Sequence, residues 1–500
     1  MKLIRSSGVI LHPSSFPGSD GIGDLGPEAY RWIDFLSAAG CSLWQVLPLG
    51  PTGFGDSPYQ CFSAFAGNPY LVSPVMLLDQ KLLSIKDLAD RPLFPENSVD
   101  FGPVIGWRIC LLDRAYGRFK KTRNQKILAD FQQFCESQKN WLNDFSLFMA
   151  IKESLGGGSW GNWPSELRKR KPEALQQFTQ DHTDEILKHS FRQFLFYQQW
   201  DQVRSYAHQK NIKIIGDIPI FVAYDSADAW SHPDLFFLDS KGQPTCVAGV
   251  PPDYFSPTGQ LWGNPLYRWN IHKKSGYEWW LQRLEAVLHL VDFIRLDHFR
   301  GFAGYWEVPA NMPTAEIGRW VKGPGKDLFR AIQKRFSSLP LLAEDLGEIT
   351  PDVVELRDSL GLPGMKIFQF GFASDPDDPF LPHNYPQNCV AYTGTHDNDT
   401  ARGWYDSAPE KERDLCRRYL ARSGDDISWD MIRAVWSSPA AFALAPLQDL
   451  LSLGTEARMN FPGKASGNWG FRYTSDQLDN DLLSRLKEIN FLYSRKSNIS

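Results

Sequence analysis

Four acidic residues stand at the ends of short apolar runs in this chain of 500 residues. Asp217, Asp297 and Glu344 are each the last residue of such a run, and Asp397 follows a fourth run. An ionised carboxylate is costly to bury, so an acid in this place needs a reason. One such acid is most simply a helix N-cap or a partner in a loop ion pair. Four of them, on four different runs, indicate a cluster of catalytic carboxylates.

Two of these acids have surroundings that suit different tasks in catalysis. Arg295 and Asp297 are two residues apart, so they share one face of an extended strand. The positive charge is expected to orient Asp297 and to favour its ionised form, as a nucleophile requires. Glu344 ends an apolar run with other acids nearby, a setting that raises the pKa of a carboxyl group and suits a general acid.

The elements that must position these acids follow a repeating pattern. An amphipathic helix, a short break and an apolar strand recur, which predicts a parallel sheet covered by helices. Eight units of this kind predict a (β/α)8 TIM barrel, whose active-site face is formed by the carboxyl ends of the strands. The count alone also fits an open, doubly wound sheet. The eight strands are expected near residues 9, 43, 213, 293, 341, 366, 390 and 442.

The spacing of the predicted strands is uneven. Roughly 160 residues separate the second strand from the third, far more than an ordinary connection needs. That segment is helical in pattern and rich in charge, so we expect an inserted subdomain at about 70–190. A second insertion is expected at about 223–276, between the third and fourth strands. The prediction is therefore one catalytic barrel over residues 1–500 with large, mainly helical insertions.

The composition argues against several classes of protein. Apolar residues make up 42% and charged residues 22%, which fits a large core and argues against disorder. Lys plus Arg is 53 and Asp plus Glu is 58, and the net charge of −5 argues against a nucleic-acid partner. No apolar run approaches the roughly 18–20 residues of a membrane span, and the first residues carry no targeting pattern. Seven scattered cysteines without a Cys-x-x-Cys pair predict reduced thiols and a cytoplasmic location.

Three short motifs resemble ligand-binding loops, but each is better explained as an ordinary turn, hinge or solvated loop. Gly21–Gly26 matches the GxGxxG pattern, but it lies far from the preceding strand and lacks the acidic partner of a dinucleotide site. Gly156–Gly158 has no following Lys and is interpreted as a hinge. Asp375–Asp378 lacks the spacing of a calcium loop. The histidines are too dispersed for a metal cluster, so neither a metal nor an organic cofactor is predicted.

Aromatic residues are numerous, with 18 Trp, 33 Phe and 17 Tyr. Trp279 and Trp280 have helical spacing and are predicted to be core. Trp160 and Trp163 lie in a Gly-rich segment and are candidates for exposed platforms on which a sugar ring stacks. The loop at 249–263 is rich in proline, so a binding role is favoured for its aromatic residues.

A series of short blocks runs in order through nearly the whole chain. Three of them enclose the acids: Phe293–His298, Ala343–Gly347 and Gly394–Asn398. The others are Leu11–Ser15, Asp56–Gln60, Ser63–Pro69, Gly216–Ile220, Asp225–Asp228, Gly249–Ser256, Trp262–Pro265, Arg458–Asn460 and Ser466–Trp469. Together these blocks resemble the 4-α-glucanotransferases of glycoside hydrolase family 77, in the α-amylase superfamily.

The resemblance implies a role for each acid. Asp297 would be the nucleophile, Glu344 the general acid/base and Asp397 the stabiliser of the transition state. Asp217 would support the sugar at the cleavage point. One position departs from the wider superfamily, because Val222 stands where an amylase has a histidine, and this favours the glucanotransferase branch over a true α-amylase. The other residues implied to hold the substrate are Tyr59, Tyr254, Phe255, Trp262, Arg295 and His396.

The implied chemistry agrees with the acids themselves. A retaining transfer between sugars needs two carboxylates about 5–5.5 Å apart, one to attack the anomeric carbon and one to protonate the leaving oxygen. The covalent intermediate is then resolved by an acceptor. A sugar 4-hydroxyl as acceptor makes the enzyme a transferase acting on α-1,4-glucans and maltooligosaccharides, and water makes it an α-1,4-glucan hydrolase. A glucan-binding barrel without catalysis is disfavoured, since all three catalytic acids are present.

Overall fold

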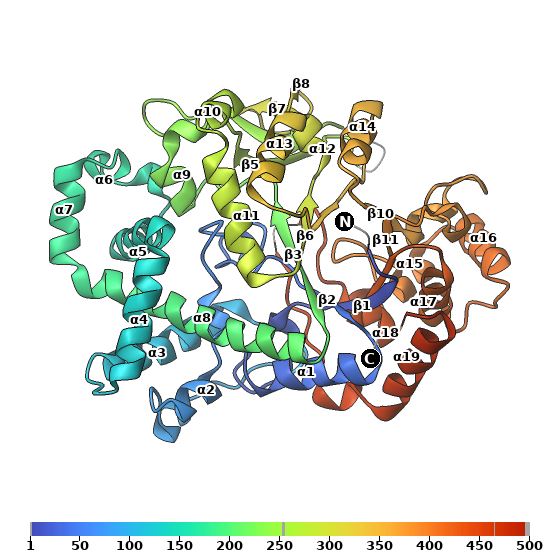
Figure 1. Ribbon diagram of the computed structural model, residues 1–500, viewed down its shortest axis with the longest axis horizontal. Helices are drawn as coiled ribbons and strands as arrows, with labels where there is room; N and C mark the ends of the chain where they lie inside the picture. The colour runs from blue at the N-terminus through green and yellow to red at the C-terminus, as the bar shows by residue number, and fades with distance from the viewer. Residues whose placement is uncertain (1–2, 253–255, 465, 496–500) are drawn as a thin grey trace.

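The centre of the molecule is one sheet of eight parallel strands. In a computed structural model, which describes residues 3–252, 256–464 and 466–495, the strand order is β10-β11-β12-β1-β2-β3-β6-β9. The backbone N–H of Ala343 at the end of β9 donates to the carbonyl of Pro363, just before β10, at 2.9 Å. This bond joins the two edges of the sheet and makes a nearly closed barrel (Figure 1). The strands are β1 (Ser6–Ile10), β2 (Leu43–Gln45), β3 (Lys213–Pro219), β6 (Phe293–Asp297), β9 (Leu341–Ala343), β10 (Gly364–Ile367), β11 (Cys389–Tyr392) and β12 (Phe442–Pro446).

All eight predicted strands are confirmed, and the open sheet is wrong. The strands were recognisable because both of their faces are buried, which makes them continuous apolar runs. One face belongs to a separate cluster inside the barrel, to which Ile215, Leu342 and Tyr392 contribute. The other face packs on the surrounding helices, as Trp44 and Ile214 do. The helices that cover the strands include α1 (Pro27–Ala38), α11 (Glu278–Leu290), α13 (Lys326–Arg335), α14 (Pro351–Ser359), α17 (Ile427–Ser437) and α19 (Asn480–Leu492).

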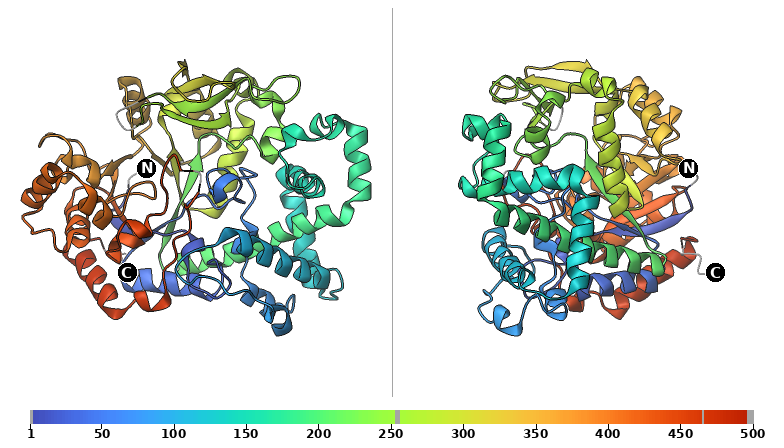
Figure 2. Two further views of the ribbon diagram at one scale, coloured as in Figure 1. Left: turned by 180° about the vertical axis from the view of Figure 1, so that it is seen from behind. Right: turned by 60° about the vertical axis from the view of Figure 1, so that its left-hand side comes forward.

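The long connection between β2 and β3 is helical. Its last and longest helix, α8 (Thr183–Gln209), runs back under the barrel and leads into β3 (Figure 1). Figure 1 and the view from behind in Figure 2 both place α5, α6 and α7 to one side of the barrel. The division into inserted subdomains at about 70–190 and 223–276 stays a prediction. The other helices of this connection are α2 (Pro74–Asp79), α3 (Phe101–Phe119), α4 (Gln125–Ser137), α5 (Lys139–Ser154), α6 (Ser165–Arg168) and α7 (Pro172–Asp181).

A second sheet, which the sequence pattern did not reveal, lies above β3 and β6 in Figure 1. It is antiparallel in the order β5-β4-β7-β8, with β4 (Cys246–Val250), β5 (Gln260–Pro265), β7 (Gly304–Pro309) and β8 (Arg319–Lys322). Two of its strands fall within the expected second insertion, and two fall between β6 and β9. β5 and β8 are short and largely exposed, so they lack the continuous apolar runs of the barrel strands.

The two tryptophans expected as exposed platforms are core residues instead. Trp160 is 1% exposed and Trp163 is 3% exposed. The Trp160 indole donates to the carbonyl of Tyr224 at 2.6 Å, and Trp163 packs against Phe148. A Gly-rich segment therefore does not imply exposed neighbours, because here it turns inward between α5 and the loop after β3. Trp279 and Trp280 are buried as predicted.

Within the three described stretches of chain, no helix combines the length and the apolarity that crossing a bilayer requires.

The loop that follows β2 is held by buried polar side chains of α8. The Gln193 side chain accepts from the N–H of Gly67 at 2.7 Å and donates to its carbonyl at 2.8 Å. Tyr197 donates to the carbonyl of Phe65 at 2.6 Å. Gln199 accepts from the N–H of Ser73 at 2.7 Å. Between Phe65 and Ser73 the chain forms only the short 3-10 helix Pro69–Leu71, and these side chains satisfy buried backbone groups of this segment.

The segment that follows β11 is held by one buried carboxyl group. Asp449, in the short helix α18 (Leu447–Leu450), accepts from the Thr393 hydroxyl at 2.5 Å and from the N–H of Ala401 at 2.7 Å. Burial raises the pKa of Asp449 to about 6, against the lowering effect of these hydrogen bonds. The two bonds fix the ends of the segment that contains Asp397.

We expect Gln193→Leu to lower the free energy of unfolding by about 1–3 kcal/mol, because it leaves both backbone groups of Gly67 buried without partners. Chemical denaturation measures this change. Gln202→Leu, at an exposed position on the same helix, is the matched control and should change stability by less than about 0.5 kcal/mol. Equal effects of the two substitutions would contradict the role of Gln193.

Asp449→Asn should remove a pH dependence from the stability. The pKa of Asp449 in the folded protein is about 6, above the ordinary value near 4, so the native state holds the proton more tightly. In the wild type this group's contribution to stability therefore falls as the pH rises from about 4 to 6. The stability of Asp449→Asn relative to wild type should rise over that range, by up to roughly 2–3 kcal/mol.

Urea unfolding at a series of pH values tests the Asp449 prediction. Asp377→Asn, in an exposed loop, is the control and should run parallel to wild type at every pH. If the Asp449→Asn curve is also parallel to wild type, Asp449 does not titrate in this range.

Candidate active site

The four acids meet at one end of the barrel. Asp297 is the last residue of β6, Glu344 directly follows β9, and Asp397 follows β11. Asp217 lies in β3, which continues for two residues beyond it. These strands are parallel, so their carboxyl ends share one face. The predicted meeting of the acids therefore follows from the topology.

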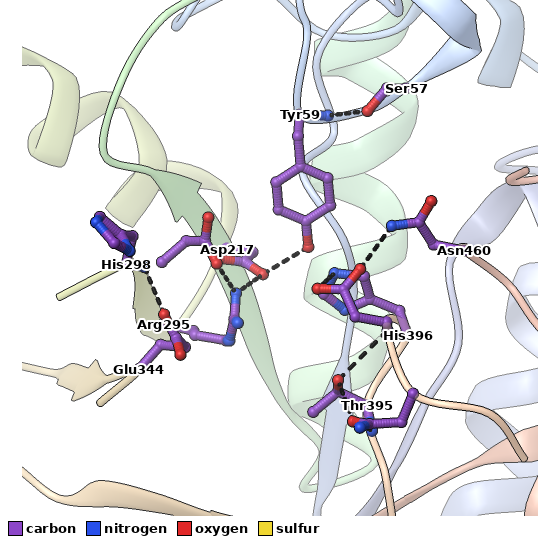
Figure 3. Close-up of polar contacts among 12 residues, drawn as sticks. Ser57, Tyr59, Asp217, Arg295, His298, Glu344, Thr395, His396 and Asn460 are labelled. Carbon is purple, nitrogen blue, oxygen red and sulfur yellow. Dashed lines mark hydrogen bonds and ion pairs between the residues drawn. The ribbon is translucent and has the colours of Figure 1, made fainter. Parts of the chain in front are cut away.

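Arg295 links two of the acids. Its Nη1 donates to Asp217 Oδ2 at 2.6 Å (Figure 3). The same nitrogen donates to Asp297 Oδ1 at 2.8 Å. Asp217 and Arg295 are paired residues on neighbouring strands, and Arg295 and Asp297 share a face of β6. Burial disfavours the charge of Arg295, but the two carboxylates outweigh this effect and raise its pKa well above the usual value. Arg295 thus stays charged and fixes the orientation of Asp297.

Asp217 is fully buried behind this pair. Its side chain has no exposed surface, whereas the side chain of Asp297 is 27% exposed and open to a substrate. Burial raises the pKa of Asp217 by more than Arg295 lowers it. The Tyr59 hydroxyl donates to Asp217 Oδ2 at 2.9 Å (Figure 3). Burial and the charge of Asp217 raise the pKa of Tyr59 well above its usual value, so Tyr59 remains a neutral donor.

Glu344 lies in different surroundings from Asp297. Its Oε2 accepts from the N–H of His298 at 2.6 Å, and its Oε1 accepts from the N–H of Leu346 at 3.1 Å. Burial raises its pKa well above the usual value, although Arg295 and the His298 N–H act in the opposite direction. A buried carboxyl group that retains its proton is suited to act as an acid.

Asp397 is held on the opposite side of the site. Asn460 Nδ2 donates to its Oδ1 at 2.6 Å, and Nε2 of His396 lies 3.3 Å from its Oδ2. Arg458 also donates to the Asp397 carbonyl at 2.5 Å. The Asp397 side chain is 44% exposed, so it faces open space. The block Arg458–Asn460 was singled out in the sequence, but its contact with Asp397 was not predictable, because the two segments are about sixty residues apart in the chain.

Aromatic rings form one wall beside these acids. Tyr59 stacks on the His396 ring at a centroid distance of 5.1 Å, and Trp469 lies 5.6 Å from Tyr59. Burial lowers the pKa of His396, so its ring is neutral at ordinary pH. Trp469 was not named as a site residue from the sequence, since only its place in the last block singled it out.

The second sheet supplies another aromatic residue. Trp262 in β5 contacts the ring of His298 edge to face, with a centroid distance of 4.8 Å. Tyr254 and Phe255, the other predicted aromatic contacts on this side, lie outside the described residues. Across the described part of the chain, no group of three or more His, Cys, Asp or Glu side chains is arranged to hold a metal ion.

Comparisons with known proteins agree with this geometry. A family model described as 4-alpha-glucanotransferase matches residues 11–478. The 4-alpha-glucanotransferase of Thermus thermophilus is 49% identical over 97% of this chain and 98% of its own length. The enzyme of the same name from a Synechocystis strain is 48% identical, over 98% of each chain.

A solved structure agrees with these relatives. Amylomaltase from Streptococcus agalactiae in complex with acarbose superposes with a TM-score of 0.96 at 38% identity, covering 99% of this chain and all of that one. The family match, the near-complete coverage and the four acids on one barrel face lead to one assignment. The chain belongs to glycoside hydrolase family 77, the 4-alpha-glucanotransferases.

Proposed function

We propose that the protein transfers α-1,4-glucan segments from a donor maltooligosaccharide to the 4-hydroxyl of an acceptor glucan or glucose, with retention of configuration. The observation that carries this proposal is the contrast between two acids on neighbouring strands. Asp297 is paired with Arg295 and partly exposed, whereas Glu344 is buried with a raised pKa. This division of properties suits a nucleophile and a general acid/base.

In the first step, an Asp297 oxygen attacks the anomeric carbon while the bond to the leaving glucan breaks. Glu344 gives its proton to the leaving oxygen, so the released glucan has a free 4-hydroxyl. In the second step, the acceptor 4-hydroxyl attacks the same carbon and returns its proton to Glu344. The bond to Asp297 breaks, and both acids regain their starting states.

The remaining residues hold the sugar and stabilise the developing charge. We assign Asp397 to transition-state stabilisation, with Asn460 and His396 fixing its carboxylate. Arg295 and His396 hold the sugar at the cleavage point, with Asp217 behind them. The aromatic residues assigned to glucan contacts are Tyr59, Tyr254, Phe255 and Trp262.

Transfer requires that a sugar acceptor outcompete water. Exclusion of water from an active site achieves this. The position of Trp262 against His298 supports a role for β5 in covering the site, since His298 directly follows the nucleophile. A hydrolase would have the same carboxylates, and the products of maltotriose distinguish the two activities. Glucose together with chains longer than maltotriose indicates transfer, only shorter products indicate hydrolysis, and no change indicates binding alone.

A cytoplasmic location is part of the proposal. All seven cysteines are free thiols, which suits a reducing compartment. The near balance of charges supports the view that neither a nucleic acid nor a membrane is a partner.

Asp297→Ala and Glu344→Gln should each reduce turnover of maltotriose by at least about 10³-fold, because each removes one half of a two-carboxylate mechanism. Product analysis over time measures the effect, and circular dichroism checks the fold. Glu355→Gln, an exposed glutamate on α14, is the control and should keep wild-type activity. More than a tenth of wild-type turnover in either active-site variant would overturn the assigned role.

Turnover should survive exhaustive chelation. The two carboxylates complete both steps without a Lewis acid, and the described residues offer no cluster of metal ligands. The protein is treated with EDTA, desalted and assayed on maltotriose with and without added calcium. Activity that disappears in the chelator and returns with calcium would show that a metal ion is required.

A further inference from the structure

The turn that follows β6 has an unusual backbone. His298 has a φ of 51°, in the left-handed region that residues other than glycine rarely adopt. This conformation turns the chain sharply at the end of the strand, directly after Asp297. The His298 N–H then donates across to Glu344 Oε2 on the neighbouring strand at 2.6 Å (Figure 3). The residue after the proposed nucleophile thus contacts the proposed acid/base through its peptide group.

This contact completes the fixation of the Glu344 carboxyl group. Leu346 N–H binds the other oxygen, so both oxygens are held by backbone donors. The charged groups that act on Glu344 are Arg295 and Asp297 on β6 and Asp345 beside it in the chain. A donor that binds a carboxylate favours the ionised form. The His298 N–H therefore sets both the orientation of Glu344 and how readily it gives up its proton.

The His298 ring packs closely against two residues. Its centroid lies 4.8 Å from that of the Trp262 ring. A Cβ atom at Gly301 would lie 3.0 Å from Cδ2 of the His298 ring, so glycine at this position allows the close approach. The Gly301 N–H also donates to the His298 carbonyl at 2.9 Å.

One nitrogen of the His298 ring makes no hydrogen bond with the described part of the chain. This nitrogen, Nε2, is buried. Burial, together with Arg300, lowers the pKa of His298 to about 3, so the ring stays neutral.

We infer that His298 is a positioning residue for Glu344: its ring packs against Trp262 and Gly301, and this packing holds the left-handed backbone that directs the His298 N–H to the acid/base. This inference rests on the proposed function, in which Glu344 protonates the leaving oxygen. It assigns no contact between the imidazole and the sugar. The sequence alone does not reveal it, because the relevant donor is a peptide group that every residue except proline has.

Substitutions that differ in their tolerance of the left-handed backbone test the inference. Asn adopts this conformation more readily than other residues with a side chain, whereas Val resists it. His298→Val should move the N–H away and lower kcat about 10- to 100-fold, while His298→Asn should keep kcat within about threefold of wild type. His298→Ala is the second variant, in case Val prevents folding, and should be intermediate.

The pH profile gives a readout that a purely structural role would not change. A general acid must be protonated, so activity falls as the pH rises through its pKa. Loss of the His298 N–H raises the pKa of Glu344, and the alkaline limb of kcat/KM should move to higher pH in His298→Val, by about 0.5 unit or more. In His298→Asn, the alkaline limb of the pH dependence of kcat/KM should lie at the same pH as in the wild type. An unmoved limb in folded Val and Ala variants would overturn the inference.

An activated leaving group separates this inference from the proposed function. Fluoride leaves with little help from an acid, so α-maltotriosyl fluoride should release fluoride in a burst from Glu344→Gln, although maltotriose is hardly cleaved. His298→Val should show the same preference for the fluoride. If Glu344→Gln lacks this preference, the acid role of Glu344 fails. If Glu344→Gln shows it and His298→Val does not, only the inference about His298 fails.

The Asn variant excludes the alternative role of the ring. If His298→Asn loses as much activity as His298→Val with no change in the alkaline limb, the imidazole itself acts on the sugar, and the positioning role is wrong.

Discussion

The site depends on one buried guanidinium shared between two carboxylates. Arg295 contacts Asp217 and Asp297 through a single nitrogen, Nη1. Removing one partner of such a cluster leaves an uncompensated charge out of water, which is strongly unfavourable. The cluster exists only in the observed register of β3 and β6, where Asp217 lies opposite Arg295. A slip of one residue would point these side chains to the opposite face. The register of β3 and β6 and the charge pairing of the active site therefore depend on each other.

This charge pairing explains how two carboxyl groups in one site behave differently. Arg295 pairs directly with Asp297, whereas Glu344 is buried and its carboxyl group is held by two peptide donors. Tyr59 and His396 remain neutral around them, so they add donors and ring surface without adding charge. Asp297 and Glu344 carry the same chemical group. Their electrostatic properties differ because Arg295 lies on the same strand as Asp297.

The sequence predicted the parts of the fold whose signals are local. Eight strands buried on both faces appear as apolar runs, and acids at their ends stand out against that background, so Asp297 and Glu344 could be placed without a structure. Other features depend on which loops meet in space. They are the second sheet, the burial of Trp160 and the hydrogen bond from Asn460 to Asp397. Short half-exposed strands and contacts between distant segments leave no periodic trace. The roles of Tyr59 and Trp262 in particular came from the resemblance, whereas the proline-rich loop itself favoured binding for Tyr254 and Phe255.

The hydrogen bonds from α8 to the loop after β2 link the thermal stability of the active site to the helical connection between β2 and β3. Tyr59 reaches Asp217 from a loop whose backbone is bound by Gln193, Tyr197 and Gln199, and these residues belong to α8, the last helix of that connection. When that helical region unfolds locally on heating, we expect the Tyr59 hydroxyl to lose its hydrogen bond to Asp217 while the barrel strands are still paired. The temperature at which the enzyme is inactivated would then lie below the melting temperature of the barrel, and tighter packing of the helices between β2 and β3 would extend its working range.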